Sequence, residues 1–126
     1  MEYLTIYFEK IREHIKQIDT LNTNFYSNHE WDIILACIDT MEDAQEAIDY
    51  YKVQSFPTDC GGKYLFIYGL FQALILQQDS INTFLKFLEI DKIWTTQNDC
   101  FLTTIRNSRN DIVGHPTNRT EDKKTN

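Results

Sequence analysis

The chain has 126 residues, of which 42% are hydrophobic and 13% aromatic, and it contains three cysteines. This length and composition suffice for one domain with one core and are short for two. Three widely spaced cysteines without a Cys-x-x-Cys pair argue against a disulfide framework and against a zinc ribbon, so we expect free thiols.

The formal net charge of −7 is unevenly distributed along the chain. Residues 1–100 carry 7 Lys/Arg and 16 Asp/Glu, whereas residues 101–126 carry 5 and 3, so the C-terminal end is basic. The longest apolar stretch, residues 64–76, is shorter than the roughly 20 residues that cross a bilayer, and the first residues do not form the apolar run of a signal peptide. We therefore expect a cytoplasmic protein without a membrane segment.

The first half of the chain is expected to form two amphipathic helices. The first, over residues 2–19, has apolar side chains at steps of three and four, namely Leu4, Phe8, Ile11, Ile15 and Ile18. Asn28 could cap the second, which runs to about residue 52 and has an acidic face. That face comprises Glu30, Asp32, Asp39, Glu42, Asp43, Glu46 and Asp49. Such a charge run is usually a solvated face, although it could also meet a basic partner surface.

A third helix is expected over residues 64–88, after a turn and helix start marked by Pro57 and the Gly61-Gly62 pair. Its first half is apolar on nearly all sides, which is typical of a central helix surrounded by partners. The trio Gln77-Gln78-Asp79 then interrupts the apolar pattern. These residues either emerge at the surface or place a polar side chain on the wall of a pocket near the last helix.

The last long helix is expected over residues 97–113, and it ends at Gly114 and Pro116. Residues 90–96 before it form a connector or a short helical turn, in which we expect Trp94 to pack against the bundle. The inward stripe of the last helix comprises Phe101, Leu102, Ile105 and Ile112. The sequence thus predicts an all-α fold, an up-and-down four-helix bundle over residues 1–117 with room for a short extra helix before the last one. Residues 118–126 are polar and are expected to form a flexible tail.

The segment 106–119 concentrates groups suited to chemistry. At helical steps of three and four, Arg109 shares the stripe of Ile105 and Ile112. An unpaired buried charge is costly, so Arg109 must pair with a carboxylate, border a cleft or meet an anion at an interface. Arg106 lies one turn earlier on the same flank, and two such guanidinium groups suit a phosphodiester placed between them.

His115 follows Gly114, where the chain can leave the helix and return the imidazole toward Arg109. Histidine near its titration midpoint can exchange a proton with a 2′-hydroxyl or a leaving 5′-oxygen, while Arg109 would stabilise the pentavalent phosphate. His14 and His29 lack this setting, and no His/Asp/Glu spacing is typical of a metal site. The alternative is a basic helix C-terminus that complements the macrodipole and simply ends at Gly and Pro.

The run Arg-Asn-Asp-Ile-Val-Gly-His at residues 109–115 resembles the signature of the HEPN superfamily (higher eukaryote and prokaryote nucleotide-binding domains). Five residues separate Arg109 from His115, a spacing that the family tolerates, and the expected helix order is similar to the family's bundle. The resemblance implies a metal-independent endoribonuclease without a cofactor. It further implies a homodimer in which Arg and His of both chains face one composite site, within toxin-antitoxin, phage-defence or CRISPR-linked systems. The catalytic residues would be Arg109, Asn110 and His115.

RNA would be bound by the basic end of the chain, through Arg106, Arg119, Lys123 and Lys124. One position departs from the branch of the family that pairs with a nucleotidyltransferase antitoxin. That branch usually carries a tyrosine two places after the histidine, and this chain has Thr117 there. The alternative function is a non-catalytic HEPN-like module that binds a nucleotide or serves as a dimerising adaptor, motivated by the acidic second helix and the polar tail.

Overall fold

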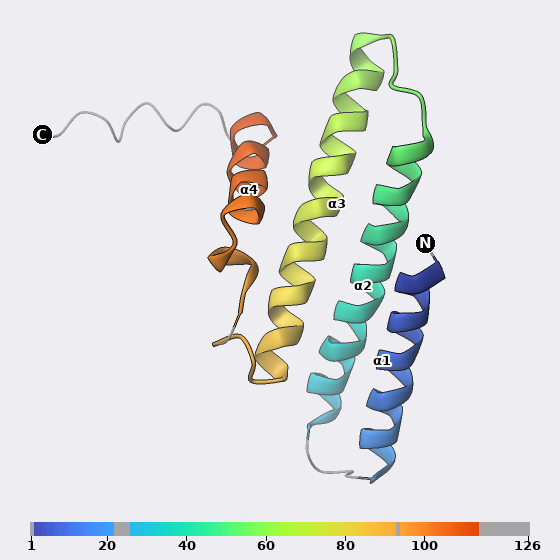
Figure 1. Ribbon diagram of the computed structural model, residues 1–126, viewed down its shortest axis with the longest axis vertical. Helices are drawn as coiled ribbons and strands as arrows, with labels where there is room; N and C mark the ends of the chain where they lie inside the picture. The colour runs from blue at the N-terminus through green and yellow to red at the C-terminus, as the bar shows by residue number, and fades with distance from the viewer. Residues whose placement is uncertain (1, 22–25, 93, 114–126) are drawn as a thin grey trace, which may run out of the picture.

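The chain folds into an all-α helical bundle. The computed structural model describes residues 2–21, 26–92 and 94–113. Its elements are α1 (Glu2–Leu21), α2 (Asn28–Val53), α3 (Cys60–Phe87), the 3-10 helix η1 (Thr96–Asn98) and α4 (Cys100–Ile112). The helices α1, α2 and α3 run in alternating directions (Figure 1). The predicted fold class is confirmed, and η1 lies where a short extra helix was expected.

Predictions that concern residues 114–126, including the flexible tail at 118–126, lie outside the described residues. Within the described part of the chain, no helix combines the length and the apolar character needed to cross a membrane.

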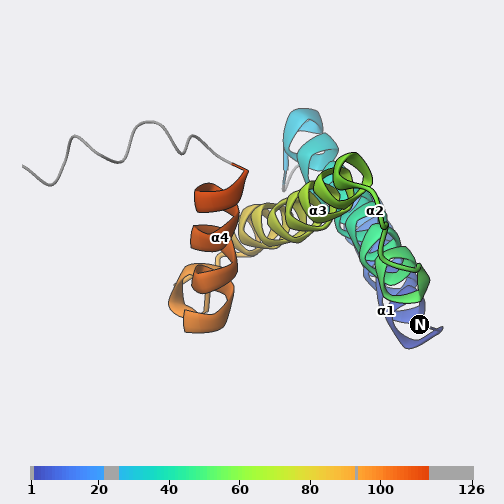
Figure 2. The same cartoon turned by 90° about the horizontal axis from the view of Figure 1, so that it is seen from above.

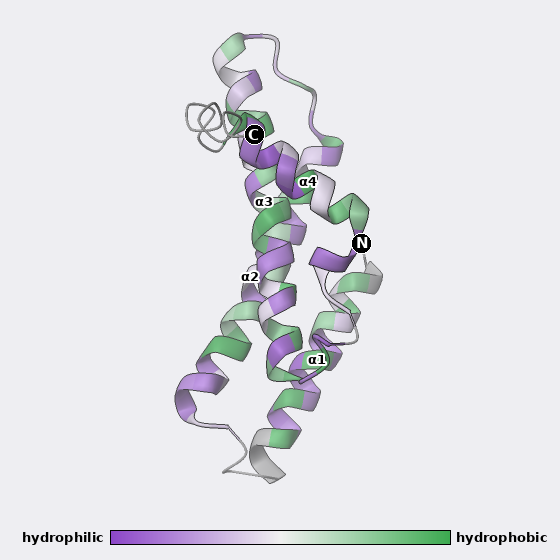
Figure 3. Ribbon diagram, turned by 90° about the vertical axis from the view of Figure 1, so that its left-hand side faces the viewer, coloured by the Kyte–Doolittle hydropathy of each residue, from purple (hydrophilic) through white to green (hydrophobic). Residues whose placement is uncertain are grey.

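The four helices form an open row rather than a ring around one core. α2 lies between α1 and α3, and α4 lies on the far side of α3 (Figures 1 and 2). Among the described residues, the backbones of α1 and α3 do not approach each other closely, and α4 approaches only α3 and η1. α4 also crosses in front of α3 when viewed from its own side (Figure 3).

The apolar core lies near the C-terminal ends of α1 and α3 and beside the first half of α2. Ile15 of α1 packs against Ile34, Ile38 and Met41 of α2, and Ile38 is fully buried. Ile81, Phe84 and Phe87 in the last two turns of α3 cover this cluster. The aromatic side chains of Tyr26 and Trp31, near the start of α2, also pack against it. Apolar and polar segments alternate along α1, as expected for an amphipathic helix that buries one stripe (Figure 3).

Side-chain caps determine where α2 and α3 begin. Ser27 caps α2 in a capping box, since its Oγ accepts from the Glu30 N–H at 3.3 Å and its own N–H donates to Glu30 Oε2 at 2.7 Å. The Ser27 backbone N–H, and then its hydroxyl, which donates to Glu30 Oε2 at 2.8 Å, lower the pKa of the Glu30 carboxylate. The predicted cap, Asn28, is instead the first helical residue. α3 begins at Cys60, earlier than predicted, because Asp59 Oδ1 accepts from the Gly62 N–H at 2.7 Å.

The prediction that the apolar first half of α3 is surrounded by partners is wrong for part of its surface. Among the described elements, only α2, on one side, and α4 with η1, on the other, approach the backbone of α3. Leu65 is 76% exposed, Leu76 is also exposed, and a side-chain carbon added at Gly69 would meet no atom within 4 Å. Trp94, which was expected to pack against the bundle, is 42% exposed and thus only partly buried.

Alanine at the two adjacent glycines of α3 should have opposite effects on stability. At Gly62, an added Cβ would lie 2.8 Å from Pro57 Cβ and 2.7 Å from Asp59 Oδ2. We therefore expect Gly62→Ala to lower the free energy of unfolding by about 1–3 kcal/mol. Gly61→Ala is the matched control, because its nearest atom is 3.5 Å away. There the better helix propensity of alanine should raise stability by about 0.5–1 kcal/mol. Urea unfolding of both variants checks this, and equal effects would contradict it.

The three cysteines should differ sharply in reactivity. All three are free; Cys37 is buried in α2, whereas Cys60 and Cys100 are exposed. Burial also raises the pKa of the Cys37 thiol, which leaves less of the reactive thiolate at neutral pH. With an aromatic disulfide reagent at pH 8, we expect rapid labelling of Cys60 and Cys100 and labelling of Cys37 only after denaturation. Peptide mapping of the labelled chain checks the assignment, and fast labelling of Cys37 in the native protein would contradict it.

Candidate active site

The helix that carries the predicted motif is held mainly on one side. Among its described residues, α4 buries no side chain completely. Leu102 and Ile105 are half-buried, but Phe101 is 69% exposed and Ile112 is 50% exposed. The prediction that all four face inward is therefore wrong for Phe101 and Ile112. The reason is that, of the described elements, α4 packs only against α3 and η1, which cover only part of its apolar stripe.

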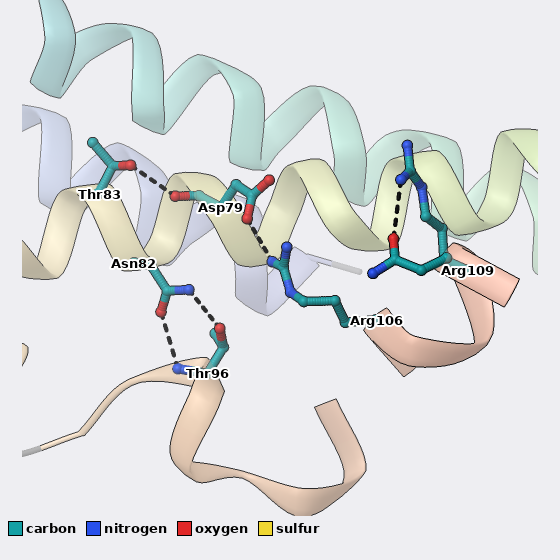
Figure 4. A network of polar contacts seen from close by, with 7 residues as sticks. Asp79, Asn82, Thr83, Thr96, Arg106 and Arg109 are labelled. Atoms are coloured by element: carbon teal, nitrogen blue, oxygen red, sulfur yellow. Dashed lines mark hydrogen bonds and ion pairs between the residues drawn. The ribbon is translucent and has the colours of Figure 1, made fainter. Parts of the chain in front are cut away.

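A pair of hydrogen bonds fixes the connector that leads into α4. Asn82 of α3 donates from Nδ2 to Thr96 Oγ1 at 2.5 Å, and its Oδ1 accepts from the Thr96 backbone N–H at 2.9 Å (Figure 4). Thr96 is 2% exposed. Asp99 then starts α4, since its Oδ1 accepts from the backbone N–H groups of Phe101 and Leu102 at 2.9 and 3.0 Å.

An ion pair provides a second link between the helices. Arg106 Nη2 lies 2.5 Å from Asp79 Oδ1 of α3 (Figure 4). Asp79 belongs to the polar trio of the sequence. Its side chain is 56% exposed, as the surface interpretation expected, and it is directed to the last helix. The other two members behave differently. Gln77 donates to Gln45 of α2 at 2.9 Å, while Gln78 is buried and its amide nitrogen has no acceptor among the described residues.

Among the described residues, the hydrogen-bond acceptors of Arg109 are neutral oxygens. Its Nη1 donates to Asn110 Oδ1 at 3.1 Å and its Nη2 donates to Gln72 Oε1 of α3 at 3.4 Å. Its Nε is enclosed and has no acceptor in the described part of the chain, and none of the carboxylates described there forms an ion pair with Arg109. The sequence required that an arginine in this position meet a carboxylate, a cleft or an anion. The first of these is not found among the described residues.

The two arginines are directed to different points on α3. Their partners, Gln72 and Asp79, are seven residues apart, which is about 10 Å along a helix. Figure 4 shows the two guanidinium groups separated along α3. This differs from the expected pair of arginines around one phosphate. With the charge of Arg106 already paired with Asp79, Arg109 is the arginine available to an anion.

The remaining predicted site residues cannot be placed. His115, Arg119, Lys123 and Lys124 lie outside the described residues, as does Thr117. Asn110 is described, and its amide oxygen orients Arg109.

Sequence reasoning missed three residues that support the site: Gln72, Asn82 and Thr96. Two of them, Gln72 and Asn82, are polar interruptions of an apolar helix. With Asp79, they recur at steps of seven and three, which places them on one helical face. This spacing is a signal that could have identified the contact face for α4.

No protein-family model, curated protein or solved structure matches this chain. In the described ranges, no group of three or more His, Cys, Asp or Glu side chains is arranged to hold a metal ion. The chemistry of the site therefore has to be inferred from its own side chains.

The Asn82–Thr96 pair should contribute more to holding α4 than the Arg106–Asp79 ion pair. Asn82→Ala leaves the buried Thr96 N–H without its acceptor, which costs about 1–3 kcal/mol. Arg106→Gln removes a solvent-accessible ion pair, which is worth about 0.2–1 kcal/mol. We expect Asn82→Ala to give the larger loss of unfolding free energy and faster amide exchange across residues 99–113. Hydrogen-exchange mass spectrometry checks this, and unchanged exchange in Asn82→Ala would contradict it.

Proposed function

We propose that this chain is a metal-independent endoribonuclease of HEPN type that acts as a homodimer, with toxin or defence-associated activity. The observation that carries the proposal is the environment of Arg109. Arg109 is half-buried, and in the described part of the chain its guanidinium has two neutral amide acceptors and an Nε without an acceptor. An unsatisfied buried donor costs about 1–3 kcal/mol, so an incoming anion would be favoured at this place.

The contact between Arg109 and Gln72 is suited to exchange. At 3.4 Å it is longer than a good N–H···O bond, so replacing it with a charged phosphate oxygen would be favourable. The hydrogen bond to Asn110 would remain and keep the guanidinium oriented. In this role Arg109 would stabilise the negative charge that develops on the phosphorane.

The reaction proposed here is internal transfer at a phosphodiester. The 2′-hydroxyl oxygen attacks phosphorus, the bond from phosphorus to the 5′-oxygen breaks, and a 2′,3′-cyclic phosphate and a 5′-hydroxyl are left. His115 takes the proton from the 2′-hydroxyl and returns one to the leaving oxygen. His115 enters the proposal from the sequence alone, because it lies outside the described residues, three positions after the last residue of α4.

The uncovered side of α4 supports the dimer. Phe101 and Ile112 are exposed there, and α4 has α3 as its single neighbouring long helix in the described structure. Two copies packed about a twofold axis would cover these side chains symmetrically. Such a dimer would also bring the motif residues of both chains to one composite site.

Arg109→Ala and His115→Ala should each reduce cleavage of single-stranded RNA at least about 100-fold, because each removes a group that acts in the transition state. The matched controls are Arg106→Ala, whose arginine pairs with Asp79, and His14→Ala, an exposed histidine of α1. We expect both controls to cleave within about threefold of the original chain, with helicity unchanged by circular dichroism.

The assay should contain a chelator, and the products should be analysed for 2′,3′-cyclic phosphate ends. Cleavage at full rate by Arg109→Ala or His115→Ala would disprove the proposal. A chain that is dimeric and folded but cleaves no RNA would favour the alternative, a nucleotide-binding or dimerising adaptor. The observation in favour of that alternative is the excess of acidic residues in residues 1–100, which opposes RNA binding outside the basic end.

A further inference from the structure

Large apolar side chains are exposed together at the opposite end of the first three helices from the core. It is formed by the first half of α1, the second half of α2 and the first half of α3, together with the α2–α3 connection. The exposed side chains are Leu4, Ile6, Tyr7, Tyr50, Val53, Phe56, Tyr64, Leu65 and Tyr68. The core at the other end covers its apolar residues with three helices, whereas α1 and α3 leave α2 open to solvent here. This end of the bundle lacks a covering element among the described residues.

Two grooves run along this open end and share one ridge. The groove between α1 and α2 has a volume of about 520 Å³, with Leu4, Phe8 and Val53 on its apolar walls. The groove between α2 and α3 has a volume of about 560 Å³, with Leu65, Phe66 and Leu70 on its walls. The side chains that line both grooves are Asp43, Glu46 and Tyr50. They lie at steps of three and four along α2, so they form a continuous ridge between the grooves.

The charge of this surface has one sign. The two linings include four carboxylates, those of Glu42, Asp43, Glu46 and Asp49, and no described lysine or arginine lines either groove. Glu42 pairs with Arg12, and Asp49 lies 2.7 Å from Lys52 Nζ. No described basic residue forms an ion pair with Asp43 or Glu46, the two carboxylates of the ridge.

The same helix face already binds one arginine from within the chain. Arg12 of α1 reaches across to α2 and pairs with Asp39, at 2.7 Å, and with Glu42. Asp43 and Glu46 continue this face by about one further turn, where no described lysine or arginine of α1 pairs with them. The ion pairs of Arg12 with Asp39 and Glu42 therefore illustrate the contact that a basic side chain of a partner could make with Asp43 and Glu46.

We propose that the two grooves and their ridge form a docking surface for a basic amphipathic helix of a partner protein. Its apolar side chains would fill the grooves, and its lysines or arginines would meet Asp43 and Glu46. Laying an amphipathic helix in an apolar groove is a common recognition mode, and complementary charge sets its orientation and favours the right partner. A second copy packed symmetrically through this same surface fits poorly, because it would bring one acidic ridge against another. The surface is separate from the proposed ribonuclease site, since α4 lies on the other side of α3.

The test titrates the full chain against a fluorescent model peptide of about 18 residues, which is five helical turns. The peptide is built from leucine and lysine in an amphipathic pattern. One control peptide replaces each lysine by glutamate, and another replaces each leucine by serine. Fluorescence anisotropy should show saturable one-to-one binding of the leucine/lysine peptide, with both controls at least tenfold weaker. Equal binding of the serine/lysine peptide would overturn the proposal, because it would mean that charge alone suffices.

Paired variants locate the binding site. Asp43→Lys with Glu46→Lys should weaken binding at least tenfold. The control, Glu13→Lys with Asp32→Lys, changes the net charge equally at exposed carboxylates outside both grooves and should alter binding less than twofold. Equal losses in the two double variants would overturn the proposal. Leu65→Ser tests the apolar wall and should also weaken binding at least tenfold, with helicity checked by circular dichroism.

Two further outcomes are decisive. If the ridge variants fail to fold, Asp43→Asn with Glu46→Gln tests the same charges with closer shapes, and undiminished binding by that variant would overturn the proposal. A concentration-dependent dimer that is lost on Leu65→Ser would show that another copy covers this surface, which would also overturn it. RNA cleavage by the ridge variants should equal that of the original chain, so failure here is distinguishable from failure of the ribonuclease proposal.

Discussion

The arrangement of the molecule depends on α3, which lies between α2 and α4, two described helices whose backbones do not approach each other. Toward α2 it presents apolar side chains such as Ile81 and Phe84, which join the core at the end of the row. Toward α4 and η1 it presents Gln72, Asp79 and Asn82, so these elements are attached through hydrogen bonds and an ion pair. Apolar burial tolerates sliding, whereas hydrogen bonds require particular distances and angles. α4 is thus positioned by directional contacts although it buries little surface.

This mode of attachment has a direct consequence for Arg109. An arginine that pointed into an apolar core would need a carboxylate, and its charge would then be unavailable to a ligand. Here the polar face of α3 supplies an amide oxygen instead, which holds the guanidinium without neutralising it. Arg106, one turn away, illustrates the other case, because Asp79 pairs with it directly. Two neighbouring arginines of the same helix therefore have different roles, one structural and one open to an anion.

Local features of the sequence predicted the helices well, because periodicity and caps act within a few residues. The stripe of Leu4 to Ile18 gave α1, and the helical period placed Arg109 beside half-buried Ile105. Long-range features were harder. The apolar residues of α3 itself could not reveal that Leu65 is left uncovered. A periodic pattern shows which side chains are apolar, but it does not show what packs against them. The Gln72 and Asp79 partners were unpredictable for the same reason, because each joins residues that are far apart in the chain.

The open row also implies that resistance to unfolding varies along each helix. The core around Ile38 binds three helices together at one end, while the helix ends near Val53 and Cys60 have few buried neighbours. Amides in such sparsely packed segments open by local fluctuations, without unfolding the whole domain. The free energy of local unfolding should thus be highest around the core and lowest at the opposite end of the helices. The acidic grooves lie at that less stable end, so a helix bound there would reduce local unfolding in the segments that open most often.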